Sequence, residues 1–245
     1  MRVLLLGGTG EARALAARLH PEVEVISSLA GRVPDPALPV GQVRVGGFGG
    51  VDGLARYLCE HAIGAVVDAT HPFAATITAN AARAAALAGL PHLVLARPAW
   101  PHGDAIVVPS DTAAAQTVAH NGYRRVFLTT GRSGTAAFRE VDAWFLIRAV
   151  TTPEPELLPA RHRLLLSRGP YDPDGEWKLL RENAIDALVT KNSGGSMTEA
   201  KLAAAHDLGI PIVMVDRPAL PDGVHVVPTV DAAIAWLHAP GRCSG

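Results

Sequence analysis

The turn at residues 7–13, GGTGEAR, has the composition and spacing of a phosphate-binding loop. It follows an apolar run at residues 3–6 and precedes a helical pattern, so backbone N–H groups and a helix N-terminus can receive an anion. Gly8 and Gly10 fit the dinucleotide-binding motif G-x-G-x-x-G, whereas Arg13 holds the place of its third glycine. A purely structural turn is the alternative. The predicted cofactor contacts of this turn are Gly8, Thr9, Gly10, Glu11 and Arg13.

The second apolar run, residues 23–27, indicates which dinucleotide the turn would hold. An NAD site usually has Asp or Glu at the end of the second strand, where the carboxylate binds the ribose hydroxyls. Here Ser27 and Ser28 occupy that place and Arg32 follows, and these groups suit a 2′-phosphate that a carboxylate would repel. The pattern favours NADPH over NADH, unless the serines and Arg32 only solvate a loop.

Two further loops of the first half follow apparent strands. The cluster GGFGG at residues 46–50 includes Gly47, where the backbone can approach a nicotinamide or a substrate; a flexible turn is the alternative. The segment DATHPFA puts Asp68, Thr70 and His71 at a strand end, and we count Thr70 among the cofactor contacts. Asp68 can orient His71, which is a candidate proton donor because a histidine pKa lies near the working pH. Otherwise Asp68 caps the loop and His71 only packs.

The second half places cations and N–H donors at two strand ends. One cation follows a glycine turn, and another closes an apolar run just before KNSGG leads into a helix. Backbone N–H groups at the start of a helix, next to a lysine, form an anion receptor. The alternatives are a solvated strand end for Lys191 and a solvated helix face for Lys201. The residues of this predicted receptor are Arg132, Lys191, Asn192, Ser193, Gly194 and Lys201.

The elements that must position these loops alternate along the chain. Short apolar runs and helical patterns follow one another, which predicts an α/β fold with parallel sheets. Residues 53–67 and 175–189 share seven identical residues, and GLPHLVLARPAWPHG from Gly89 matches GIPIVMVDRPALPDG from Gly209. Chance similarity in an alanine-rich chain is the alternative to an internal repeat.

The repeat predicts two similar Rossmann-like open parallel-sheet domains with a ligand crevice between them. We expect an N-terminal cofactor-binding domain at residues 1–108 and a C-terminal substrate-binding domain at residues 109–245. Ligands of open parallel sheets bind beyond the carboxyl ends of the strands. The unusual residues of this sequence stand at those ends.

The overall composition excludes several classes of protein. The formal net charge is −1 and there is no run of Lys or Arg, so we expect no nucleic-acid or membrane partner. No apolar stretch reaches the length of about 18 residues that a membrane span needs. The two cysteines, Cys59 and Cys243, lie far apart, and the ten histidines lack ligand spacing, so we predict no metal and a cytoplasmic location.

Taken together, the motifs resemble the precorrin-6A reductases of cobalamin (vitamin B12) biosynthesis. The segments GGTGEAR, SLAGR, GGFGG, DATHPFA, RPAW, TTGR and KNSGG occur in one order between residues 2 and 218. The resemblance implies NADPH-dependent hydride transfer to a double bond of the macrocycle precorrin-6A, which gives precorrin-6B. It also implies that the anion receptor of the second half binds the acetate and propionate arms of that substrate, and it makes other cobalamin-pathway enzymes candidate partners.

Three other functions remain open or are excluded by the sequence. A cobalt-precorrin-6A reductase of the anaerobic pathway is the close variant. A non-catalytic nucleotide- or tetrapyrrole-binding protein is the alternative of a different class. A short-chain reductase acting on a small carbonyl is disfavoured, because none of Tyr57, Tyr123 and Tyr171 has a lysine four residues later.

Overall fold

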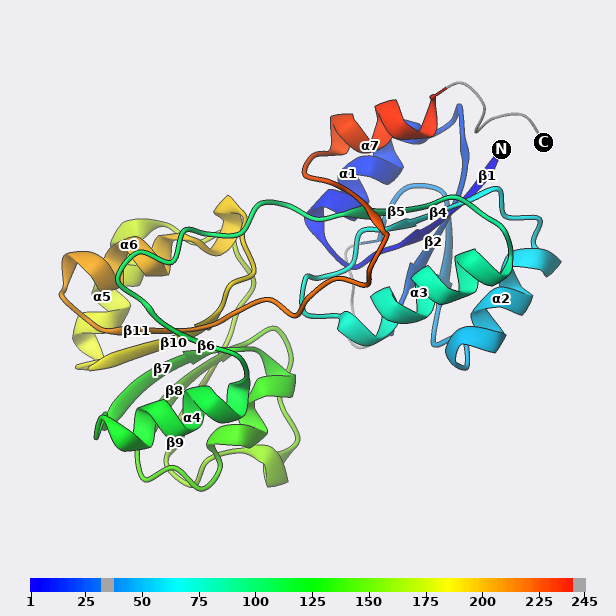
Figure 1. Cartoon of the computed structure of the whole chain (residues 1–245). Coiled ribbons are helices and arrows are strands. Elements are labelled where there is room, and N and C mark those ends of the chain that lie inside the picture. Colours follow the sequence, from blue (N-terminus) through cyan, green and yellow to red (C-terminus); the bar gives the residue numbers. More distant parts are fainter. Residues whose placement is uncertain (32–37, 240–245) are drawn as a thin grey trace. The chain divides into compact units, whose positions relative to one another are not determined.

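The computed structural model describes residues 1–31 and 38–239, and the chain forms two compact units (Figure 1). The first unit comprises Met1–Pro98 and the chain from Pro218 on, and the second comprises Ala99–Arg217. In the described ranges, no helix has the length and hydropathy that a membrane crossing requires.

The first unit is a parallel sheet of six strands in the order β12-β5-β4-β1-β2-β3, with helices on both faces. Its strands are β1 (Arg2–Leu6), β2 (Glu24–Leu29), β3 (Gln42–Val45), β4 (Ala65–Asp68), β5 (His92–Leu95) and β12 (His225–Val227). Its helices are α1 (Gly10–Leu19), α2 (Gly50–Glu60), α3 (Ala75–Leu87) and α7 (Val230–Leu237).

The second unit has a parallel sheet in the equivalent order, β6-β11-β10-β7-β8-β9. Its strands are β6 (Ile106–Val108), β7 (Arg125–Thr129), β8 (Trp144–Ala149), β9 (His162–Leu166), β10 (Ala187–Lys191) and β11 (Ile212–Val215). Its helices are α4 (Asp111–His120), α5 (Pro173–Glu182) and α6 (Ala200–Asp207), with 3-10 turns η1 (Arg132–Phe138), η2 (Pro155–Leu157) and η3 (Ser196–Thr198).

The backbone reproduces the internal repeat at its most constrained position. Ala62 and Ala184 both have φ of 49°, and they are the only non-glycine residues with positive φ in the ranges that the structure describes. In both copies the next residue closes the turn, because the Ile63 and Ile185 N–H groups donate over 3.0 Å to carbonyls at the end of the preceding helix. Two residues in the same rare conformation at matching positions support duplication over chance similarity.

The boundary between the units differs from the predicted one at residues 108 and 109. Strand β6 follows the first half in sequence but pairs with β11 of the second unit, and β12 follows the second half but pairs with β5 of the first. Helix α4 packs on β6 and β11, while α7 packs on α1 and β5. Each sheet therefore takes its edge strand, and the helix after it, from the other half of the repeat.

The strands of the first unit are apolar on both faces because helices cover both (Figure 1). Val3 and Leu5 of β1 point to the layer of α1 and α7, whereas Leu4 and Leu6 point to the layer of α2 and α3. All four side chains are buried. The packed sheet holds the loops after its strands at one edge, where the predicted site residues of this unit lie.

Candidate functional site

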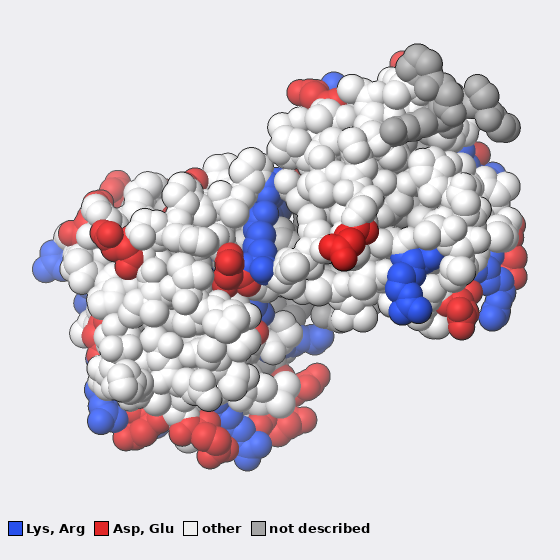
Figure 2. Space-filling view, in the orientation of Figure 1, with Lys and Arg blue, Asp and Glu red and all other residues white. Residues whose placement is uncertain are grey.

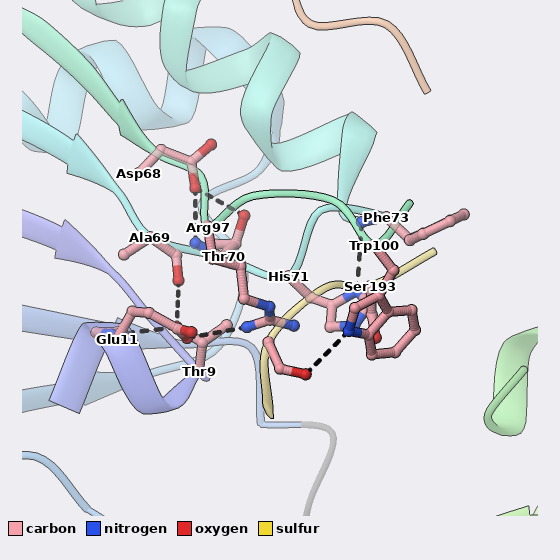
Figure 3. Close-up of polar contacts among 12 residues, drawn as sticks. Thr9, Glu11, Asp68, Ala69, Thr70, His71, Phe73, Arg97, Trp100 and Ser193 are labelled. Atoms are coloured by element: carbon pink, nitrogen blue, oxygen red, sulfur yellow. Dashed lines mark hydrogen bonds and ion pairs between the residues drawn. The ribbon is translucent and has the colours of Figure 1, made fainter. Parts of the chain in front are cut away.

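The glycine turn connects the buried strand β1 to helix α1. Gly8 has φ of +113°, which favours glycine, and a Cβ atom built there would meet no heavy atom within 4 Å. Thr9 is the N-cap of α1, since its hydroxyl oxygen accepts from the Ala12 N–H over 3.1 Å. The same hydroxyl donates over 2.7 Å to the Ala69 carbonyl after β4 (Figure 3). Thr9 therefore binds the turn to the neighbouring strand end and leaves open space at Gly8.

The first turn of α1 carries one paired and one unpaired charge. Glu11 forms an ion pair of 2.9 Å with Arg97, which follows β5, and both side chains are largely buried (Figure 3). Arg97 compensates a carboxylate that would otherwise repel an anion at this helix N-terminus. Arg13 is half-buried, and its side chain has no hydrogen bond or ion pair with any described residue.

The loop after β4 differs from the predicted arrangement of an Asp68–His71 pair. Asp68 is buried, and its Oδ1 accepts from the Thr70 N–H over 3.0 Å and from the Thr70 hydroxyl over 2.7 Å. The Nδ1 atom of His71 accepts from the Phe73 N–H over 3.3 Å, a contact drawn as a dashed line in Figure 3. Asp68 therefore orients Thr70, because a side chain two residues away reaches back to the carboxylate more easily than His71 does.

The ends of β2 and β3 bring a serine and an arginine together. Ser28 and Arg44 are register partners, and the Arg44 Nη1 donates to the Ser28 hydroxyl over 2.8 Å. Ser27 points to the opposite face, where its hydroxyl is buried without a hydrogen-bond partner among the described residues. Arg32 lies outside the described residues. The Gly47 carbonyl accepts a hydrogen bond from the Arg44 Nη2 over 3.0 Å.

An apolar groove of about 290 Å³ lies beside the start of α3 in the first unit. The groove has one hydroxyl, that of Thr78, among apolar walls. Leu220, which lines the groove, is exposed, whereas its repeat counterpart in the second unit, Trp100, is buried. The lining residues are Pro72, Ala75, Thr78, Ala79, Pro218, Ala219, Leu220 and Pro221.

The KNSGG loop of the second unit is fixed by the side chain of Asn192. Asn192 is fully buried; its Oδ1 accepts from the Trp100 N–H over 2.9 Å and its Nδ2 donates to the Trp100 carbonyl over 3.1 Å. Both polar atoms of the Asn192 side chain therefore bind backbone, and the Asn192 backbone N–H donates over 2.9 Å to the Val215 carbonyl. Arg217 donates to the carbonyls of Asn192 and Ser193, and Gly194 has φ of +66°. The loop is thus a rigid turn with its carbonyls bound.

The cations of the second unit lie in different surroundings. Lys191 forms an ion pair of 3.0 Å with Asp111 at the start of α4, and its side chain is only 11% exposed. Arg132 is half-buried at the start of η1 and has no side-chain hydrogen bond or ion pair with described residues. Figure 2 shows charged side chains of both signs interspersed on the drawn face, so no broad region of one sign covers that face.

Lys201 is buried beneath the KNSGG loop, so it is neither the direct anion contact nor the solvated side chain that the sequence suggested. Its ammonium donates to the Thr198 carbonyl and lies 4.5 Å from the centre of the Trp100 ring. Burial, and then the nearby Arg148 guanidinium, lower the pKa of Lys201 to about 7. Arg148 itself forms a buried bidentate pair with Glu176. These contacts hold the Lys201 ammonium between the Thr198 carbonyl and the Trp100 ring.

Sequence reasoning missed four residues that shape these loops. They are Arg44, Arg97, Trp100 and Asp111. Arg97 and Trp100 lie in RPAW, a segment noted for its repetition as RPAL and for the family resemblance but not for a site. The position of Arg44 two residues before the second glycine cluster was a usable signal, since it placed a cation near the end of an apparent strand.

Comparison with known proteins identifies the family. A family model described as Precorrin-6x reductase CbiJ/CobK matches residues 2–238. The chain belongs to this family. It is 65% identical over 236 residues to a precorrin-6A reductase of Mycobacterium tuberculosis, covering 96% of this chain and 97% of that protein. A precorrin-6A reductase of Rhodococcus erythropolis is 54% identical over 246 residues, with 96% and 97% covered.

A solved structure described as CobK precorrin-6A reductase has the same fold as this reductase. The TM-score is 0.89 at 38% identity, covering 97% of this chain and 96% of that one. A cobalt-precorrin-6A reductase of Priestia megaterium is 30% identical, with 90% of this chain and 92% of that protein covered. The predicted family, the two parallel α/β units and the assignment as a reductase enzyme are confirmed.

Proposed function

We propose that this reductase uses NADPH to reduce a double bond of precorrin-6A, which gives precorrin-6B. The observation that carries the cofactor choice is the absence of a carboxylate at the end of β2, where Ser27 and Ser28 stand. NAD sites usually have an acidic residue there. The higher identity to precorrin-6A reductases than to the cobalt-precorrin-6A reductase favours the metal-free substrate.

The first unit binds the cofactor in this proposal. The open backbone at Gly8 and the N-terminus of α1, which begins at Gly10, receive the pyrophosphate, and Arg13 adds a cation from the first turn. Pairing of Glu11 with Arg97 removes a charge that would oppose this binding. When bound, NADPH supplies the hydride, so the protein mainly aligns the two reactants and excludes water.

The loop after β4 contributes Thr70 and His71. Asp68 holds Thr70 through two hydrogen bonds, so Thr70 is a positioned cofactor contact and Asp68 is its positioning residue. Acceptance of the Phe73 N–H at Nδ1 leaves the proton of a neutral His71 on Nε2. Nε2 is then the atom through which His71 acts: it donates a hydrogen bond while the ring is neutral, and the protonated ring is the candidate proton donor if the reduction requires a proton at that step.

The second unit binds the acidic arms of the substrate. Arg132, Lys191, the Ser193 side chain and the N–H group of Gly194 are the proposed carboxylate contacts, because the Ser193 N–H already donates to the Lys191 carbonyl. Asn192 and Lys201 hold the loop in shape. Asp111 lowers the net charge near Lys191 but also fixes its position. A guanidinium and backbone N–H groups both suit carboxylates.

The test is the decay of absorbance at 340 nm with purified protein, NADPH and precorrin-6A. We expect NADPH to be consumed and precorrin-6B to form, whereas a binding protein without activity would bind both ligands and consume nothing. Turnover with cobalt-precorrin-6A alone would assign the cobalt substrate instead. In the same assay His71→Ala should lower turnover about 10²- to 10⁴-fold, and unchanged turnover would remove His71 as proton donor.

A further inference from the structure

The structure assigns to Arg44 the recognition of the cofactor's 2′-phosphate, with Ser28 orienting the guanidinium. We infer this from the position and charge of Arg44 and from its two N–H donors that have no acceptor among the described residues, and the inference rests on the proposed use of NADPH. Arg44 was not among the residues that the sequence pointed to. With this role for Arg44, the neighbouring ends of β2 and β3 form the subsite that discriminates NADPH from NADH.

The position of Arg44 is fixed from three sides. Its Nη1 donates to the Ser28 hydroxyl over 2.8 Å and to the Gly46 carbonyl over 2.9 Å, and its Nη2 donates to the Gly47 carbonyl over 3.0 Å. The guanidinium carbon lies 3.8 Å from the centre of the Phe48 ring. A guanidinium held in one plane loses little further freedom when it binds a phosphate.

The charge of Arg44 is not compensated by a carboxylate in the described ranges. The described ion pairs of Arg2, Arg18 and Arg97 each include an acidic partner, but none includes Arg44. The neighbouring ends of β2 and β3 carry serines and valine rather than Asp or Glu. Arg44 is a half-buried cation without a carboxylate partner in those ranges, and such a cation at the ribose end of a dinucleotide site favours binding of an anion.

The donors that remain on Arg44 match a phosphate. A guanidinium has five N–H donors, and the three hydrogen bonds above use two on Nη1 and one on Nη2. The Nε–H and the second Nη2–H have no acceptor among the described residues. Two parallel N–H groups on one edge of arginine are the arrangement that binds phosphate oxygens in a bidentate manner.

A purely structural role for Arg44 predicts a different result from a recognition role. If Arg44 only holds the carbonyls of Gly46 and Gly47, its loss would weaken NADP⁺ and NAD⁺ equally, because both share the rest of the molecule. Recognition of the 2′-phosphate predicts a loss confined to NADP⁺. The ratio of the two affinities therefore separates the roles.

The experiment measures dissociation constants of NADP⁺ and NAD⁺ for the wild-type protein, Arg44→Gln and Arg44→Lys by calorimetry. For Arg44→Gln we expect NADP⁺ to bind about 10- to 150-fold more weakly, with NAD⁺ changed less than about threefold. Arg44→Lys keeps the charge without the bidentate edge and should fall in between. The control is Arg56→Gln, an exposed residue of α2, which should change neither constant.

A second pair of ligands isolates the phosphate itself. The compound 2′,5′-ADP should lose affinity for Arg44→Gln as NADP⁺ does, whereas 5′-AMP should not. Equal weakening of both nucleotides, or no change, in both Arg44 variants would overturn the assignment of Arg44. Failure of the proposed cofactor is distinguishable, because the wild-type protein would then bind NAD⁺ as tightly as NADP⁺.

Discussion

At the scale of single residues, the candidate site depends on buried polar side chains that bind backbone. Asp68 and Asn192 stand at equivalent loops of the two units. Asp68 binds Thr70 of its own loop, and Asn192 binds the backbone of Trp100. Removal of such a group leaves its buried partners unsatisfied, which is costly. A residue held by such bonds, as Thr70 is by Asp68, is left to meet a ligand.

Lys201 gives a prediction on pH at this scale. Burial lowers its pKa to about 7 in the folded protein from an ordinary value of 10.5. Below about pH 7 the lysine is charged in both the folded and the unfolded protein, and burial of that charge opposes folding. Between about pH 7 and 10.5 the lysine is protonated in the unfolded chain but largely neutral in the folded protein. The free energy of unfolding should therefore rise with pH across this window through Lys201.

Urea unfolding at several pH values between about 6 and 10 checks this prediction. Lys201→Met removes the titrating group. Its free energy of unfolding should therefore rise less with pH across this range than that of the wild type. Lys178→Met is the matched control, since Lys178 is an exposed lysine of α5 and should leave the curve unchanged. A curve for Lys201→Met parallel to that of the wild type would contradict the lowered pKa.

At the scale of elements, three helices begin with a hydroxyl side chain as N-cap, but only one of them borders the glycine turn. Thr9 of α1, Ser110 of α4 and Thr229 of α7 each accept a hydrogen bond from a backbone N–H of the first turn. Only the Thr9 hydroxyl also donates to a neighbouring strand end, at the Ala69 carbonyl. The start of α1 is thus the most firmly placed of the three.

Thr9→Ala should lower the free energy of unfolding by about 0.5–2 kcal/mol through loss of the cap. It should also weaken NADP⁺ binding, because the turn loses its bond to Ala69. Ser110→Ala is the matched control: it removes an equivalent cap and should reduce stability similarly without changing cofactor affinity. Calorimetric binding and urea unfolding of both variants decide the matter, and equal cofactor affinity in the two would count against a cofactor role for the turn.

At the scale of the whole molecule, the exchange of edge strands makes each unit depend on the other half of the chain. Strand β12 covers the edge of β5, and α7 contributes Trp236 and Leu237 to the core of the first unit. The second unit, by contrast, is contained in one continuous segment, Ala99–Arg217. The two units should therefore respond differently to removal of the C-terminal segment.

A chain ending at Arg217 should lose the cooperative unfolding of the first unit and keep that of the second. The reason is that the deletion exposes the β5 edge and uncovers core side chains, each of which contributes roughly 1.5–3 kcal/mol when fully buried. Thermal unfolding and NADP⁺ binding test this, with the full chain as reference. A truncated chain that binds NADP⁺ as the full chain does would show that β12 and α7 are dispensable.

The sequence by itself determined the parallel α/β class, the duplication and the family. The spacing of apolar residues indicates helices and strands locally. The identical residues around Ala62 and Ala184 show the repeat in the sequence, and the equal φ angles of these two alanines show it in the backbone. The glycine turn before α1 was readable for the same reason, since its chemistry lies within one short segment. These features depend on neighbours in the chain, so no tertiary contact was needed to predict them.

Only the tertiary structure decided which unit contains β6 and β12, and which partners the site residues have. Strand pairing and side-chain contacts join residues far apart in the chain, as Asn192 with Trp100, Lys191 with Asp111 and Ser28 with Arg44. A sequence pattern gives the type of residue at a strand end but not the group opposite it. That is why Lys201 was expected to contact a ligand and instead lies buried beneath the loop.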